Sequence, residues 1–309
     1  MGKTRNYSLY IGVFFVSLML IGGIIGPKVA PHDLTYNSGV YSEVIDGKYT
    51  LFSPPFPPFE SKQYILGTDY WGYDLLSELL YGMRYTIIIG VSVALIKVLL
   101  GTIIGIGIGM LKKQPVWWEA FEETWSYIPS FLIVYFMLVN ITIESPFTPV
   151  ELSVLFALIA GIVGVPSIAS TVRHKTIEIK KRPFMEAAVV SGATRMTIIR
   201  KEVFPHLRSE MPYLLVIEIV HTLSLMGQLA LFNLFIGGTK FDPEFNTFVS
   251  VTKEWAGLVG QARPSLMWGQ SYLMFIPLAF LLFMILSFTL LAHGIKVKAQ
   301  KTYFKAPWY

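Results

Sequence analysis

The sequence predicts an all-α integral membrane protein with six transmembrane helices. Hydrophobic residues occupy 53% of the 309 positions and charged residues only 15%, a balance typical of proteins embedded in lipid. Six apolar runs are long enough to cross a hydrocarbon core of about 30 Å at about 1.5 Å per helical residue. These runs are Leu9–Ile25, Tyr85–Leu111, Tyr127–Ile143, Leu152–Ala169, Tyr213–Ile236 and Leu273–Ala292.

We interpret the first run as a retained signal anchor. Lys3 and Arg5 precede it, and the residues that follow, Gly26-Pro27-Lys28, lack the small-x-small pattern of a cleavage site. The second run is longer than a straight span needs, so we expect it to tilt or to begin in the membrane interface. Three glycines at four-residue spacing predict close helix packing along it: Gly101, Gly105 and Gly109.

Lysine and arginine predict the orientation, because they concentrate in cytoplasmic loops. Placing both termini in the cytoplasm puts Lys112, Lys113 and the basic cluster between Thr171 and Glu210 inside as well. The net charge of +5 then follows from topology, so lipid and not nucleic acid is the expected polyanionic partner. We divide the chain into an N-terminal tip with the first helix (1–26), an outside segment (27–84), a five-helix core (85–294) with a cytoplasmic loop at 171–210, and a cytoplasmic tail (295–309).

The outside segment combines a hairpin with an extended stretch. Val44–Tyr49 contains Asp46-Gly47, which predicts a tight hairpin turn. Ser53–Phe59 is too rich in proline to be helical. The segment would either contact an external binding protein or form a rigid cover over the outer mouth.

The loop at 171–210 predicts two short helices. Pro183 suits a first helical position, and Gly192 suits the left-handed residue that ends a helix. Thr194 is then positioned to cap the second helix, on which Met196, Ile199 and Val203 share one face. Pro205 is expected to discourage continuation.

This loop resembles the EAA loop of ABC importer permeases, E-A-A-x3-G-x9-I-x-L-P. The spacing matches throughout, and Glu202 and Phe204 depart from the usual Ile and Leu. The resemblance implies a coupling helix seated in a groove of an ATPase subunit; the alternative is a solvated amphipathic loop with no partner. The residues assigned to coupling are Glu186, Ala187, Ala188, Gly192, Arg195, Phe204 and Pro205.

A second stretch resembles the L-G-T-D-x-x-G-R-D-x-x-S-R-x-x-Y-G-x-R signature of the C-type permease subunit of dipeptide and oligopeptide ABC importers. Tyr73 and Glu78 replace the two internal arginines of that pattern. Thr68 or Asp69 is expected to cap a short helix whose Leu75, Leu79 and Met83 lie in the membrane interface. The matching residues are Gly67, Thr68, Asp69, Gly72, Asp74, Ser77, Tyr81, Gly82 and Arg84.

The resemblance implies a MetI-like permease fold in the cytoplasmic membrane of a prokaryote. Its partners would be a second homologous permease subunit, two ATPase subunits and an extracytoplasmic solute-binding protein. This chain has no Walker A pattern, so ATP and Mg would bind the ATPase subunits, and the chain itself would be no enzyme and hold no cofactor or metal. The solute would be a peptide or peptide-like compound, with nickel and metallophores as further members of the family's range.

Polar side chains within two of the runs suggest a translocation path. A lysine near the middle of a span costs roughly 2.5–3.5 kcal/mol on insertion scales, so Lys97 should face the bundle interior, a wet cavity or an acidic partner. We hypothesise that it pairs with Glu218 or with the partner permease, and that one face of the fifth run lines the path. The alternative is that these groups only satisfy each other between helices. The members of that face are Glu218, His221, Ser224 and Gln228.

Three remaining segments have simpler interpretations. Lys112–Tyr127 is expected to be an interfacial anchor with aromatic and acidic sides, and Gly237–Met267 a loop near the outer gate. The basic tail, Lys296–Tyr309, would contact lipid headgroups or help dock an ATPase.

Two other functional classes fit parts of the sequence pattern of apolar runs and ionisable residues. Ionisable residues within spans would suit an ion-coupled secondary transporter, although no inverted repeat is evident. A non-transporting membrane receptor or scaffold is the third class.

Overall fold

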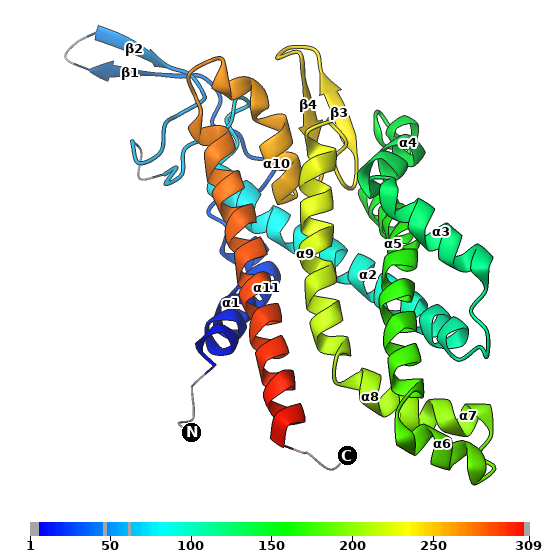
Figure 1. Cartoon of the computed structure of the whole chain (residues 1–309). Coiled ribbons are helices and arrows are strands. Elements are labelled where there is room, and N and C mark those ends of the chain that lie inside the picture. Colours follow the sequence, from blue (N-terminus) through cyan, green and yellow to red (C-terminus); the bar gives the residue numbers. More distant parts are fainter. Residues whose placement is uncertain (1–5, 46–47, 61–62, 306–309) are drawn as a thin grey trace.

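The computed structural model describes residues 6–45, 48–60 and 63–305, which form a helical bundle with two β-hairpins (Figure 1). The predicted all-α membrane fold is confirmed. The helices are α1 (Tyr7–Val29), α2 (Leu75–Gly109), α3 (Val116–Tyr127), α4 (Ser130–Thr142), α5 (Pro149–Lys180), α6 (Pro183–Val190), α7 (Arg195–Ile198), α8 (Phe204–Arg208), α9 (Met211–Ala230), α10 (Trp255–Gln261) and α11 (Tyr272–Lys305). Two further turns are a π-helix, η1 (Ile199–Val203), and a 3₁₀-helix, η2 (Arg263–Leu266).

Within the described residues, five helices are long and apolar enough to cross a membrane, namely α1, α2, α5, α9 and α11. The third predicted run corresponds to α4, which has only 13 residues and gives a sixth span only when it is counted together with α3, from which it is bent by 75°. The bend falls at Ile128-Pro129, where both residues are extended. Proline disfavours a helical conformation in the residue before it, which explains why α3 ends there.

The elements divide between two ends of the bundle. Figure 1 shows α6, α7 and α8 at the lower end, with the start of α1 and the end of α11, and both hairpins at the upper end. We call the segment 183–208, which holds α6, α7, η1 and α8, the knob, and name the two ends the knob end and the hairpin end.

The first hairpin is confirmed: β1 (Tyr41–Ile45) pairs antiparallel with β2 (Lys48–Phe52), with Ile45 opposite Lys48. The predicted turn residues, Asp46-Gly47, lie outside the described residues, as do Lys3, Arg5 and the last four residues of the tail. No helix occurs in 53–59, as predicted.

The segment Gly237–Met267 is more ordered than the predicted loop. It contains the second hairpin, in which β3 (Thr239–Asp242) pairs antiparallel with β4 (Thr247–Ser250), followed by α10 and η2.

The beginning of α2 differs from the prediction. Asp74, and not Thr68 or Asp69, is its N-cap, because the Asp74 carboxylate accepts the Ser77 backbone N–H. The helix then continues unbroken to Gly109, so the boundary drawn after residue 84 falls inside it. Leu75, Leu79 and Met83 are buried in the core of the protein.

Other helices also extend beyond the predicted spans. α5 continues through the first part of the predicted loop at 171–210, and α11 continues into the predicted tail. Apolar runs mark only the lipid-embedded part of a helix, whereas the hydrogen-bonded helix continues through polar residues until a cap or a proline ends it.

The close approach of α2 to α5 depends on the predicted glycines. A Cβ at Gly101 would lie 2.6 Å from Cβ of Ile168, and one at Gly105 would lie 2.6 Å from the backbone oxygen of Ala169. Small residues let helix backbones approach closely in this way. A Cβ added at Gly107, in the same helix, would meet no atom within 4 Å, so Gly107 faces away from α5.

Gly105 and Gly107 define a test of the packing of α2 against α5. Gly105→Ala should destabilise the protein by about 1–3 kcal/mol, because the added methyl group meets a backbone atom that cannot rotate away. Gly107→Ala should be neutral or stabilising by up to about 1 kcal/mol, since alanine favours helix and meets nothing. Thermal unfolding of both purified variants in detergent measures the difference, and equal effects would contradict the packing role of Gly105.

Candidate functional site

The knob begins as the sequence predicts. Pro183 opens α6, and Gly192 follows its end with φ +79°, a conformation that favours glycine. The Gly192 N–H donates to the Val189 carbonyl and the Ala193 N–H to that of Ala188, which is the Schellman pattern of helix ends.

The second half of the knob is one continuous helical path with a wide turn inside it. Thr194 caps α7 by accepting the Thr197 N–H, as predicted. The helix does not stop near Pro205: η1 connects α7 to α8, and Pro205 lies in the first turn of α8. The Phe204 N–H donates to the Ile199 carbonyl across the π turn, and the missing N–H of Pro205 costs nothing at the start of a new turn.

One side of the knob packs against the bundle and the other is exposed. Ile198, Val203 and other apolar residues are buried in a cluster that includes Val98 and Ile106 of α2 and Ile168, Val172 and Ile179 of α5. The predicted apolar face is therefore partly wrong, because Met196 is exposed and Ile198 takes its place. The exposed apolar residues are Val189, Val190, Met196 and Phe204.

The other predicted coupling residues occupy different environments. Glu186 and Ala187 are exposed on α6, whereas Ala188 is half-buried. Arg195 is also exposed, but its guanidinium turns back and donates to the Gly107 carbonyl of α2 at 3.1 Å.

The structure pairs Lys97 with Glu218, one of the two partners that the sequence suggests. The Lys97 Nζ lies 3.2 Å from the Glu218 Oε2, and both side chains are buried. His221 contacts the other carboxylate oxygen through Nδ1 at 2.9 Å. Gly164 on α5 makes the pair possible, because a side chain there would collide with the Lys97 stem.

This pair borders a hollow of about 610 Å³ between α3, α5 and α9. Lys97, Glu218 and His221 line it, together with Glu122 and Trp125 of α3. Ser224 and Gln228 are exposed farther along α9 and do not line the hollow. Hydroxyl groups supply much of the remaining polar lining, from Ser126, Ser130, Ser167, Ser170 and Thr171.

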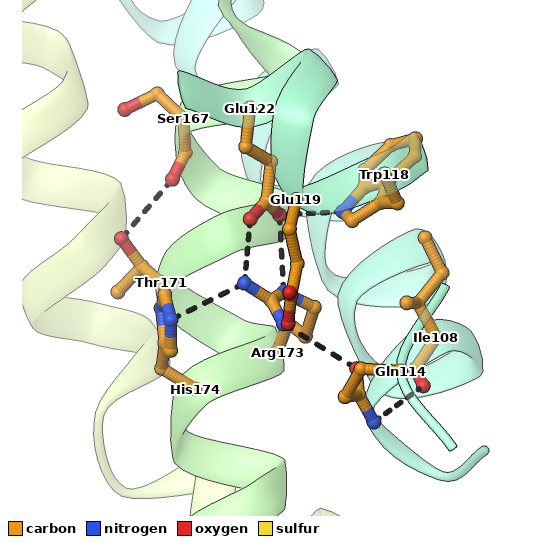
Figure 2. Close-up of polar contacts among 9 residues, drawn as sticks. All are labelled: Ile108, Gln114, Trp118, Glu119, Glu122, Ser167, Thr171, Arg173 and His174. Carbon is orange, nitrogen blue, oxygen red and sulfur yellow. Dashed lines mark hydrogen bonds and ion pairs between the residues drawn. The ribbon is translucent and has the colours of Figure 1, made fainter. Parts of the chain in front are cut away.

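Arg173 holds the amphipathic helix α3 against α5, a contact that the sequence does not indicate. Figure 2 shows its guanidinium between Glu119 and Glu122, with Nη2 2.7 Å from Glu122 Oε2 and Nη1 3.3 Å from Glu119 Oε1. The Trp118 indole N–H donates to the same Glu122 carboxylate at 2.5 Å. The predicted division of this segment into aromatic and acidic sides is thus explained, because the acidic side faces a buried arginine.

The signature in the last part of the outside segment begins with a tight turn at the hairpin end. Gly67 and Gly72 both have positive φ, +80° and +84°. The Asp69 carboxylate accepts the backbone N–H groups of Trp71 and Tyr73 and so shapes the turn. The other signature residues are a buried Thr68, the N-cap pair Asp74 and Ser77, a half-buried Tyr81, a buried Gly82 and an exposed Arg84.

Lys253 contacts both residues that replace the arginines of the pattern. Its Nζ lies 2.6 Å from Glu78 Oε1, and 5.4 Å from the centre of the Tyr73 ring. Burial, followed by the neighbouring Glu78, raises the pKa of Asp69 well above its ordinary value. Burial alone would lower the pKa of Lys253, but Glu78 and Asp69 outweigh it and raise that pKa.

The two residues after Lys253 complete the attachment to α2. The Trp255 indole N–H donates to the Leu79 carbonyl at 2.8 Å. Glu254 is fully buried and caps α10 by accepting the Ala256 N–H at 2.8 Å. Gly82 lies directly beneath the Lys253 carbonyl, where any side chain would collide with it.

The chemistry of these groups suits binding or passage of a polar molecule. No three His, Asp or Glu side chains gather as metal ligands would in the part of the chain that the structure describes. The hollow beside Lys97 instead offers hydroxyl and imidazole groups that can exchange hydrogen bonds with a solute.

Comparison with known proteins places this geometry in a family. Residues 97–298 match the model of the binding-protein-dependent transport system inner membrane component. A putative peptide transport system permease protein of Brucella abortus is 25% identical over 234 residues, 75% of this chain and 71% of that protein. The dipeptide transport system permease protein of Haemophilus influenzae is 23% identical over 294 residues, 94% of this chain and 90% of that protein. The glutathione transport system permease protein of Escherichia coli is 24% identical over 296 residues, 94% and 86% of the two chains.

Glu254 predicts a pH dependence of stability. Burial raises the pKa of its carboxyl from 4.5 to about 7, so the folded protein retains a proton that the unfolded chain releases in this window. The stabilisation is therefore complete below about pH 4.5 and is lost as the pH rises through about 7. Glu254→Gln keeps an acceptor oxygen but cannot titrate.

The measurement is the thermal unfolding midpoint of the purified protein and of this variant across the window. The difference between the two profiles should change with pH, and parallel profiles would show that Glu254 does not titrate there.

Proposed function

Because the chain belongs to the family of binding-protein-dependent transport system inner membrane components, we propose that it forms half of a translocation pathway for peptides or peptide-like solutes. Membership makes it a transport permease of the cytoplasmic membrane and not an enzyme. The relatives are named for transport of peptides, dipeptides and glutathione, and this range supports the peptide class of solute.

The single observation that carries the coupling proposal is the knob. It is a compact helical unit with a buried side continuous with α2 and α5 and an exposed side that presents Val190 and Met196 to solvent. Contiguous exposed apolar side chains are typical of protein interfaces, and we assign Val190 and Met196 to one such patch. We assign this surface to a groove on an ATPase subunit, which binds ATP and Mg and closes during the cycle.

We assign the remaining partners from the orientation of the two ends of the bundle. We place the knob end in the cytoplasm, because it carries the basic residues around α5 and α6. The hairpin end would then face the solute-binding protein. Six spans form half of a pathway in this type of transporter, so the complex would contain a second permease and two ATPase subunits.

We propose that the hollow beside Lys97, Glu218 and His221 is part of the path. Its polar lining suits a hydrated solute rich in amide groups, and alternating access would open it to one side at a time. The mutual neutralisation of Lys97 and Glu218 weakens the ion-coupled alternative, since neither charge is left free to bind a coupling ion.

The docking surface can be tested by changing its exposed apolar residues. Val190→Glu with Met196→Glu should reduce co-purification of the ATPase subunits at least about tenfold, because the interface would bury unpaired charges. Lys201→Gln, an exposed polar change in the same knob, is the control. Undiminished co-purification, or ATP-independent solute uptake by the chain alone in proteoliposomes, would contradict the proposal.

The path can be tested separately in the reconstituted transporter. Glu218→Gln and His221→Ala should each lower solute uptake per ATP hydrolysed, because they alter the lining where the solute passes. Leu282→Ala, a truncation on the exposed face of α11, should leave uptake unchanged. If both hollow variants transport normally with normal ATPase coupling, the hollow is structural.

A further inference from the structure

The knob end of α2 has an unusual set of hydrogen-bond donors. A helix leaves its last four carbonyl oxygens without partners inside the helix. In α2, backbone N–H groups of the following residues, Met110 and Leu111, satisfy the carbonyls of Ile106 and Ile108 at 2.9 and 3.0 Å. The carbonyls of Gly107 and Gly109 receive side chains from elsewhere in the chain.

Both of these donors are cationic. The Arg195 Nη2 donates to the Gly107 carbonyl at 3.1 Å, and the Lys180 Nζ donates to the Gly109 carbonyl at 3.0 Å and to that of Leu111 at 2.7 Å. Charged donors make stronger hydrogen bonds than neutral ones. They also lie at the negative end of the α2 dipole, which favours cations.

The positions of the two donors in the chain matter for coupling. Lys180 is the last residue of α5, just before the knob, and Arg195 is the first residue of α7, in its middle. They therefore flank α6, the helix with the EAA residues. The chain on either side of α6 is therefore attached to the same end of α2.

Apolar packing between α6 and the end of α2 is incomplete on the exposed side of the knob. A hollow of about 970 Å³ lies there, with Met110 and Leu111 on the α2 side and Met185, Val189 and Val190 on the α6 side. Lys180 and Arg195 both line it. Their hydrogen bonds reach α2 from the two sides of α6, where side-chain packing is incomplete.

We propose that Lys180 and Arg195 are positioning residues that transmit displacement of the knob to α2, and through α2 to the Lys97 contact in the hollow beside Glu218. This inference rests on the proposed function, because the displacement comes from the ATPase. It assigns to Arg195 a contact within this chain and not one with the ATPase surface.

The test uses the complete transporter in proteoliposomes, with Lys180→Gln, Arg195→Gln and the double variant. The double variant should retain its ATPase subunits and hydrolyse ATP, while solute uptake per ATP falls about tenfold, within the range typical of coupling between sites. Lys180→Arg should preserve coupling because it retains a cationic donor. Arg200→Gln, an exposed cation of the same loop, is the matched control and should behave as wild type.

The outcomes separate the two proposals. If wild type recruits no ATPase, the proposed function fails. If wild type is coupled and the double variant transports with an unchanged uptake per ATP, the inference fails while the function stands.

A second measurement remains informative if the double variant transports poorly for lack of stability. The chain has no cysteine, so two introduced cysteines can be spin-labelled alone. Labels at Val190 on the knob and Ile103 on α2, both exposed, report the distance between them. Each single variant should broaden this distance distribution, and an unchanged distribution would overturn the proposal.

Discussion

The close packing of α2 against α5 is the constraint on which the other features depend. Gly101, Gly105 and Gly109 bring the two backbones together, and side chains at these positions would meet α5 atoms 2.6–2.7 Å away. Because α2 is one unbroken helix, this contact also determines where its ends lie. Its first turns carry the Lys253–Trp255 segment, its middle carries Lys97, and its last carbonyls face the knob.

Charge burial follows a consistent pattern across the molecule. Three cations inside the bundle lie against carboxylates: Lys97 against Glu218, Arg173 against Glu122, and Lys253 against Glu78. Removing one partner from such a pair leaves an uncompensated charge, which costs far more than the intact pair contributes. These pairs join segments distant in sequence and thereby specify which faces meet.

Local sequence rules predict the parts of the structure that local interactions determine. Pro183, Gly192 and Thr194 end and begin helices where the rules place them, and the glycine spacing of α2 identifies its packed face. The Lys97–Glu218 pair is predictable because a lone charge in a span demands a partner.

Long-range contacts explain what sequence reasoning misses. Arg173 and Lys253 both sit in polar stretches, where a charged residue is ordinarily solvated, so nothing local marks them as structural. The start of α2 is misplaced for a related reason. Leu75 and Leu79 are buried in the same core as Trp255, which comes from a distant segment that periodicity cannot reveal.

The unbroken length of α2 has a mechanical consequence. Lys97 stands about 33 Å from the Leu75 end and about 18 Å from the Gly109 end, at about 1.5 Å per residue. A rigid rod that pivots near Lys97 has two arms of unequal length, a short arm toward Gly109 and a long arm toward Leu75. If α2 pivots there, a shift of the short arm moves the long arm in the opposite direction by nearly twice the distance, so a small displacement at one end of the bundle becomes a larger one at the other.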